Sequence, residues 1–205
     1  YYTYGLNKKS NFCISNIIQK KNFSKFDIKI KIPGKQRVLK NLTIPWIGVH
    51  NIKNAASALS VAFSIGVSDK IIKKGLKNFK GVQRRFNYLF KKNQIAFFDD
   101  YAHHPTEIES VLDGVKKVYN EEEIVCIFQP HRISRVRSLK KEFSKCFKKA
   151  NTILLCPIYK AGENIKLGFS YESFAKLIAK NSNVNLIMLK NEHELKKIIK
   201  NITFG

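Results

Sequence analysis

The first 48 residues alternate between apolar and polar positions in short runs. The apolar runs cover 2–6, 12–19, 26–32 and 39–44, with Pro33-Gly34 and Pro45 as interruptions. Isoleucine and lysine alternate strictly over 28–32, which is typical of a strand with one face in water. This region therefore predicts a small, mostly antiparallel sheet.

The spacing becomes helical near residue 50. Apolar side chains recur three or four positions apart over 52–63, and Asn51 is expected to cap the start of this helix. A second, shorter helix is expected over 68–79. Gly81 follows, and we place a domain boundary there, which gives domains 1–80 and 81–205.

Strand-like and helix-like stretches alternate through the second domain. The expected order is strand 86–90, strand 95–98, a helix from Pro105, strand 124–128, a helix spanning Val136 to Phe147, strand 152–156, helix 171–179, strand 184–189 and helix 192–199. Such alternation predicts the α/β class, with a mostly parallel sheet covered on both faces. We expect the apolar strand 95–98 to be buried.

Polar side chains follow two of these strands directly. Seven of the nine residues from Asp99 to Glu107 are polar or titratable, and 129–132 (Gln-Pro-His-Arg) follow the strand at 124–128. In open α/β sheets, ligands bind outside the carboxyl ends of the strands. We therefore expect the two loops to face one ligand.

Composition indicates a globular chain with room for one large or two small domains. Of its 205 residues, 44% are apolar, and no apolar run approaches the roughly 18 to 20 residues of a membrane span. The four cysteines lack metal-ligand spacing, so we do not expect them to form a metal site. We interpret them as reduced core residues of a cytoplasmic protein.

The net charge of +23 suggests nucleic acid, but the distribution of the charge argues against specific binding. Of the 38 basic residues, 32 are lysines spread along the whole chain. The arginines are concentrated instead: five of the six lie near the two polar loops, at Arg84, Arg85, Arg132, Arg135 and Arg137. Arginine recognises carboxylate and phosphate with two parallel hydrogen bonds, which lysine does not reproduce.

Four strings carry a resemblance to a known family. Residues 48–56, 81–86, 99–106 and 128–132 resemble the bacterial Mur ligases, and the resemblance covers essentially the whole chain. Asp-Asp-Tyr-Ala-His-His-Pro narrows the match to two branches, one adding L-alanine to UDP-N-acetylmuramate and one recycling murein tripeptide. Phe-Gln-Pro-His-Arg, with Arg135, favours the L-alanine branch. A non-catalytic basic nucleotide-binding module is the alternative from a different class.

The resemblance implies that 1–80 is the C-terminal part of a central ATPase domain and that 81–205 is a Rossmann-like domain missing its last strand. No Gly-x-x-x-x-Gly-Lys-Ser/Thr phosphate loop occurs in the sequence. In the family that loop, the Mg²⁺ ligands and the UDP-sugar domain precede the region that matches this chain. We therefore expect a fragment that is inactive by itself.

The resemblance also implies chemistry and residue roles for peptidoglycan (cell wall) synthesis. ATP would phosphorylate the muramyl carboxylate, and the alanine amine would displace the phosphate. The implied ATP-binding residues are His50, Asn51, Asn54, Arg85 and Asp100; the L-alanine-binding residues are Tyr101, Arg132 and Arg135; the catalytic residues are His103 and His131. Asn54 has an ordinary capping role as its alternative, and His104 is expected to be structural.

Overall fold

The computed structural model describes residues 1–82, 84–163 and 169–204, and the chain divides into two compact units. The first unit contains residues 1–82 with 117–120, and the second contains the remainder of the described chain. We describe each unit by itself.

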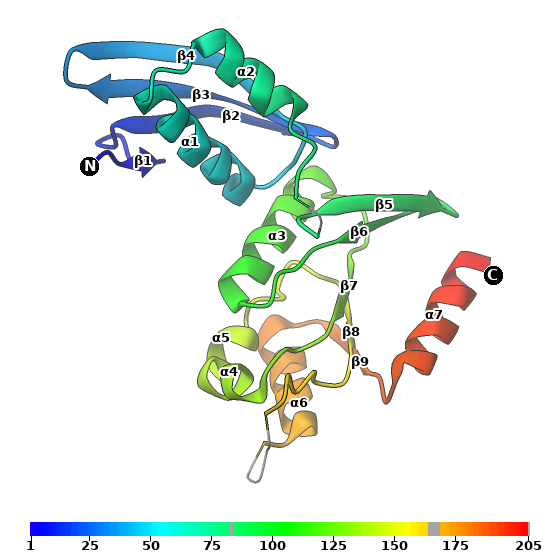
Figure 1. Ribbon diagram of the computed structural model, residues 1–205. Coiled ribbons are helices and arrows are strands. Elements are labelled where there is room, and N and C mark those ends of the chain that lie inside the picture. Colours follow the sequence, from blue (N-terminus) through cyan, green and yellow to red (C-terminus); the bar gives the residue numbers. More distant parts are fainter. Residues whose placement is uncertain (83, 164–168, 205) are drawn as a thin grey trace. The chain divides into compact units, whose positions relative to one another are not determined.

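The first unit is a four-stranded sheet with two helices. Its strands, β1 (Tyr4–Gly5), β2 (Phe12–Lys20), β3 (Phe23–Ile32) and β4 (Lys35–Ile44), lie in that order, and all neighbours except the parallel pair β1–β2 are antiparallel. The helices α1 (Val49–Ser64) and α2 (Asp69–Asn78) pack against it (Figure 1). Ile28 and Ile30 are buried while Lys29 and Lys31 are exposed, as the alternation predicted.

The start of α1 differs from the prediction. Gly48, not Asn51, occupies the N-cap position, with a φ of 95°. This positive φ favours glycine, and a Cβ at Gly48 would also lie 2.5 Å from Cε1 of the His50 ring, which would then have to move. Asn51 lies inside the first turn, and its side-chain amide donates to the Ile47 carbonyl oxygen at 2.8 Å.

The second unit contains a hairpin and a parallel sheet. The strands β5 (Asn87–Lys92) and β6 (Ile95–Asp99) pair antiparallel, whereas β7 (Val125–Phe128), β8 (Thr152–Leu155) and β9 (Asn185–Met188) form a parallel sheet in the order β7-β8-β9. Its helices are α3 (Pro105–Val118), α4 (Ile133–Ser138), α5 (Lys140–Phe143), α6 (Tyr171–Ser182) and α7 (Glu192–Phe204).

Helices cover both faces of the parallel sheet. Ile153 and Leu155 of β8 join a core with residues of α3, α5 and α6, whereas the intervening Leu154 packs with Leu195 and Ile198 of α7. The helices α6 and α7 accordingly lie on opposite sides of the three strands in Figure 1. This arrangement confirms the predicted α/β class with a mostly parallel sheet.

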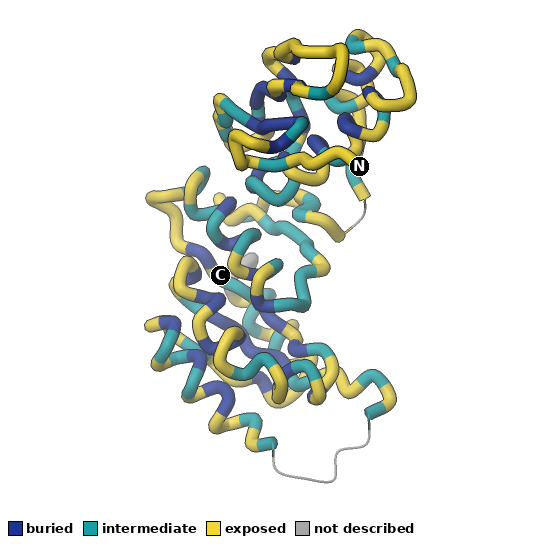
Figure 2. The backbone as a smooth tube through the Cα atoms, turned by 90° about the vertical axis from the view of Figure 1, so that its left-hand side faces the viewer, coloured by how far each residue is buried: buried dark blue, intermediate teal, exposed yellow. Residues whose placement is uncertain are grey.

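Two local predictions were wrong. The strand at 95–98 is not buried: it pairs only with β5 among the described strands, and Ile95 remains 39% exposed. The buried positions, dark blue in Figure 2, occur in both units. The single helix expected from Val136 to Phe147 is two short helices, because the backbone leaves the helical region at Leu139 (φ −111°, ψ 26°). Val136, Phe143 and Phe147 are nevertheless all buried, so apolar periodicity located the core correctly but not the break.

The cysteines belong to the core. Cys13, Cys146 and Cys156 are buried, Cys126 is half-buried, and all four are free thiols. Burial, with a smaller effect of Cys156, raises the pKa of Cys126 to about 12, and burial also raises the pKa of Cys146. These thiols therefore stay protonated at neutral pH and behave as apolar side chains. None of the helices in the described part of the chain has the length and apolarity needed to span a membrane.

Candidate active site

The loop between β6 and α3 is fixed at its start by Asp100. One carboxylate oxygen accepts a hydrogen bond from the Ala102 N–H at 2.7 Å, and the other accepts one from the Phe86 N–H at 2.8 Å. The Tyr101 N–H donates to the Arg84 carbonyl oxygen at 2.8 Å, and the Arg84 guanidinium lies 4.6 Å from the Tyr101 ring centre. The loop is thus tied to the segment that precedes β5.

The end of the same loop is a capped helix start. His104 precedes Pro105, the first residue of α3, and its ring Nδ1 accepts a hydrogen bond from the Thr106 N–H at 3.3 Å. Glu107 accepts in return from the N–H groups of His103 and His104 at 3.1 and 3.2 Å. This reciprocal arrangement is a capping box, and it gives His104 the structural role predicted for it.

Glu107 stays ionised in this position. Burial raises the pKa of its carboxyl, but the two backbone hydrogen bonds, together with the charges of His103 and Arg85, outweigh burial and hold the pKa below its usual value. The carboxylate therefore keeps accepting both bonds at neutral pH, which fixes the backbone position of His103.

The ring of His103 has a defined orientation. Its Nδ1 lies 2.9 Å from the Tyr101 carbonyl oxygen. A carbonyl oxygen only accepts hydrogen bonds, so Nδ1 carries the proton in the neutral ring and Nε2 has the free lone pair. His103 is thus arranged to accept a proton at Nε2.

The second loop connects β7 to α4 and is held by the segment after β8. The Tyr159 N–H donates to the Pro130 carbonyl oxygen at 2.8 Å, and the Arg132 N–H donates to the Tyr159 carbonyl oxygen at 2.9 Å. Arg132 is the N-cap of α4 and has a φ of 66°. Such a conformation costs a non-glycine residue about 1–3 kcal/mol, so the surrounding contacts must enforce it.

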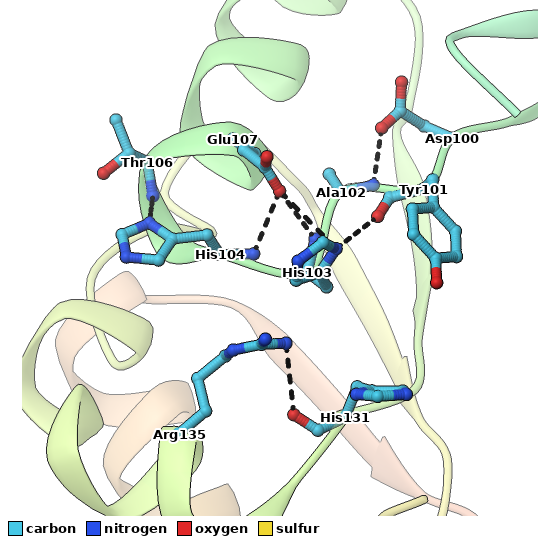
Figure 3. Close-up of polar contacts among 9 residues, drawn as sticks. All are labelled: Asp100, Tyr101, Ala102, His103, His104, Thr106, Glu107, His131 and Arg135. Carbon is cyan, nitrogen blue, oxygen red and sulfur yellow. Dashed lines mark hydrogen bonds and ion pairs between the residues drawn. The ribbon is translucent and has the colours of Figure 1, made fainter. Parts of the chain in front are cut away.

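The two loops meet, as the sequence predicted. Four rings form a row from Tyr101 through His103 and His131 to Tyr159, with successive centroid distances of 5.3, 6.4 and 5.1 Å. Arg135 lies one turn into α4, and its guanidinium is 3.5 Å from the His131 carbonyl oxygen. In Figure 3 the Arg135 side chain extends from α4 toward the rings of His103 and His131.

The charges around His131 favour its neutral form. Burial lowers its pKa first, and the nearby charges of Arg135, Arg132 and His103 lower it further, whereas Glu163 partly offsets them. Within the described residues, no carboxylate forms an ion pair with Arg132 or Arg135. The site therefore combines two cationic side chains with two imidazoles that can accept a proton.

The residues predicted for ATP are divided between the units. His50, Asn51 and Asn54 lie in the first two turns of α1, where Asn54 is exposed and the other two are half-buried. Arg85 and Asp100 belong to the second unit. Only the L-alanine set and the two catalytic candidates thus lie within a single unit.

Sequence reasoning missed three residues of this site. Tyr159 and Glu163 follow β8, and Ser134 in the first turn of α4 donates its N–H to Glu163 at 3.0 Å. The polar loop after a parallel strand was the signal used for the first two loops, and applying it to β8 would have found this third one. Among the described residues, no group of three His, Cys, Asp or Glu side chains is arranged to hold a metal ion.

A family model and curated relatives both connect this chain with the Mur ligases. Residues 84–202 match the family model described as the glutamate ligase domain of Mur ligases. The UDP-N-acetylmuramate–L-alanine ligase of Pelagibacter ubique is 57% identical over 206 residues, covering 100% of this chain and 44% of the relative. The ligase of the same name from Agrobacterium fabrum is 42% identical over 86% of this chain and 38% of its own length.

Solved structures agree. A crystal structure of UDP-N-acetylmuramate-alanine ligase from Thermotoga maritima aligns with a TM-score of 0.74 and 26% identity, covering 96% of this chain and 41% of that one. A murein peptide ligase from Psychrobacter arcticus aligns at 0.60 and 24% identity, over 96% of this chain and 40% of that one, which shows a shared fold. The chain thus spans less than half the length of the relatives it matches.

Proposed function

Because the chain belongs to the Mur ligase family, we propose that it forms the amino-acid-binding part of a ligase that joins L-alanine to UDP-N-acetylmuramate in peptidoglycan synthesis, at the expense of ATP. In this proposal residues 1–80 belong to the central ATPase domain and residues 81–205 are the Rossmann-like C-terminal domain. Both nucleotide substrates are cytoplasmic metabolites, so the enzyme would act in the cytoplasm.

The observation that supports the proposal most strongly is the juxtaposition of Arg135 with His103 and His131. A free amino acid presents a carboxylate and an ammonium group two bonds apart. A site for it needs a cationic partner for the first and a proton acceptor for the second. Arg132 and Arg135 have no carboxylate partner within the described residues, and His103 has Nε2 available as an acceptor.

The chemistry follows from this arrangement. The arginines hold the α-carboxylate, His103 accepts a proton from the ammonium group at Nε2, and the neutral amine attacks the activated muramyl carboxyl carbon. A C–N bond forms, the bond from that carbon to the phosphate oxygen breaks, and inorganic phosphate leaves with the second proton that the nitrogen loses as it becomes an amide. His131, kept neutral by burial and by the arginines, provides a second acceptor beside the same space.

ATP supplies the activation as an acyl phosphate. His50, Asn51, Asn54, Arg85 and Asp100 are the residues proposed to bind its adenosine and phosphate groups. Among them, Asp100 accepts two backbone hydrogen bonds that fix its carboxylate at the start of the loop, and it is the residue proposed to contact the ribose. No three His, Cys, Asp or Glu side chains among the described residues are grouped to hold a metal ion, and we assign none of them to Mg²⁺.

The recycling of murein tripeptide is the competing activity. The two relatives quoted above that exceed 40% identity are both named for L-alanine, and the murein peptide ligase structure supports the fold alone. We therefore favour the single amino acid as substrate.

A chimeric enzyme tests this choice. The 205 residues would replace the matching 44% of the Pelagibacter ubique ligase. Phosphate release is then measured with ATP and UDP-N-acetylmuramate, and with L-alanine, glycine, L-serine or murein tripeptide as acceptor. We expect the highest kcat/KM with L-alanine. A higher value with the tripeptide would replace the proposal by the recycling reaction.

A further inference from the structure

The segment after β8 holds the arginine-bearing loop from one side. Two backbone hydrogen bonds connect them, from the Tyr159 N–H to the Pro130 carbonyl oxygen and from the Arg132 N–H to the Tyr159 carbonyl oxygen. Side chains add three more: the Gln129 amide donates to the Pro157 carbonyl oxygen at 3.3 Å, and the N–H and hydroxyl of Ser134 both donate to the Glu163 carboxylate. Glu163 is therefore the one charged side chain among these contacts.

Both oxygens of Glu163 are directed at Ser134. One accepts the Ser134 N–H at 3.0 Å, and the other accepts the Ser134 hydroxyl. These bonds lower the pKa of the Glu163 carboxyl, so the group is an anion at neutral pH. Ser134 lies between Arg132 and Arg135 in sequence. The Glu163 carboxylate is therefore bound to the same short stretch of backbone from which both arginine side chains extend.

The local backbone needs such a restraint. Arg132 has a positive φ, and its side chain makes no capping hydrogen bond to α4. The helix α4 has six residues, which is too short to be stable without tertiary contacts. A carboxylate near the first turn also interacts favourably with the partial positive charge of a helix N-terminus.

We propose that Glu163 is a positioning residue for amino-acid binding: its contact with Ser134 fixes the turn at Arg132 and thereby aims Arg132 and Arg135 at the substrate carboxylate. The inference rests on the proposed function. It adds a residue from a third strand-end loop, which neither the sequence motifs nor the comparisons assign to the site.

The kinetic test uses Glu163→Gln in the chimeric ligase. A glutamine keeps the size and one acceptor but loses the charge and the second acceptor. We expect KM for L-alanine to rise about tenfold or more, because hydrogen bonds to charged groups contribute on this scale, with kcat and KM for ATP changed less than about twofold. Glu172→Gln, which removes an exposed carboxylate from the first turn of α6, is the matched control and should leave all three constants unchanged.

A double-variant comparison separates positioning from general loss of packing. Ser134→Ala removes the hydroxyl partner of Glu163, so Ser134→Ala combined with Glu163→Gln should raise KM for L-alanine less than the product of the two single effects. Independent, multiplying effects would overturn the proposal. So would an unchanged KM for L-alanine in Glu163→Gln, or equal rises in the KM values for L-alanine and ATP.

A substrate-free measurement keeps this inference distinct from the proposed function. Hydrogen exchange at the Ser134 amide in the 205-residue chain should accelerate at least tenfold in Glu163→Gln and stay unchanged in Glu172→Gln. If no amino acid is used by the chimeric enzyme while the exchange result holds, the proposed function fails and the positioning contact stands. Unchanged exchange at Ser134 would overturn the contact itself.

Discussion

His103 and His131 come from different strand-end loops, yet their ring centroids lie 6.4 Å apart, with the rings inclined at 51°. Each ring has a neighbour that restrains it. The Tyr101 carbonyl oxygen accepts a hydrogen bond from His103 Nδ1, and the centroid of the Tyr159 ring lies 5.1 Å from that of His131. The two imidazoles therefore have defined orientations before any substrate is present. This preorganisation is what a proton acceptor for an amine requires.

Replacing His103 by asparagine tests its role as proton acceptor. The asparagine amide can still donate to the Tyr101 carbonyl oxygen, but it offers no basic nitrogen at the position of Nε2. We expect kcat/KM for L-alanine in the chimeric ligase to fall about 10²- to 10⁴-fold at pH 7, the usual contribution of a general base. The loss should diminish at higher pH, as the substrate amine loses its proton to solvent.

The pH profile of that variant provides the control. A deficit that stays constant between pH 7 and pH 9.5 would contradict a proton-accepting role and would leave His103 a structural residue. Thermal unfolding of the variant should match that of the unmodified chain, because the hydrogen bond to Tyr101 is retained.

We expect His131 to become protonated at a pH below the usual range for histidine. Burial and the charges of Arg135 and Arg132 lower its pKa, so the ring should remain neutral as the pH falls through 6.5 and become charged only in more acidic solution. As the pH falls, the unfolded chain therefore binds this proton at a higher pH than the folded chain does. Stability due to the neutral ring is thus present above the unfolded pKa and declines as the pH falls below it.

Two-dimensional NMR of the imidazole protons in the 205-residue chain measures this pKa directly. Replacing Arg135 by methionine removes one of the charges that disfavour the protonated ring, so the His131 midpoint should move to higher pH. A His131 midpoint at or above 6.5 in the unmodified chain would contradict this electrostatic description.

The 205 residues alone should lack ligase activity. Their sequence contains no phosphate loop, the element that would hold the transferred phosphate of ATP. An assay with ATP, Mg²⁺, UDP-N-acetylmuramate and L-alanine should therefore show no phosphate release above background, whereas the chimeric ligase should release phosphate. Normal turnover by the isolated chain would show that these residues contain a complete ATPase centre.

Much of the fold could be predicted from periodicity. The alternation at Ile28–Ile32 indicated a strand with one wet face, and the helical spacing from Ile52 to Phe63 indicated a packed helix; both are present. The failures had local causes. Gly48, with a φ of 95° that favours glycine, is the N-cap in place of Asn51, and the period of the apolar residues does not specify at which residue a helix starts.

The position of the site could be predicted from the rule that ligands bind where strands of an α/β sheet end, but only for the strands to which the rule was applied. Polar residues after β6 and β7 located the two loops, and the resemblance to Mur ligases selected Tyr101, His103, His131 and Arg135; the structure brings these four together. Glu163 was missed because the rule was not applied to the loop after β8, and its hydrogen bond to Ser134, 29 positions away, leaves no periodic signal. The backbone at Arg132 was also missed, since its positive φ is imposed by tertiary contacts with Tyr159 and is not favoured by its own side chain.

Arg135→Lys in the chimeric ligase tests the assignment of the amino-acid site most directly. Lysine keeps the charge but loses the planar fork, so KM for L-alanine should rise about ten- to a hundredfold, or roughly 1.4 to 2.8 kcal/mol, while KM for ATP stays nearly constant. Arg137→Lys, at an exposed position of the same helix, is the control and should change neither constant. An unchanged KM for L-alanine in Arg135→Lys, or a selective loss of ATP binding, would contradict the assignment of this arginine to the substrate carboxylate.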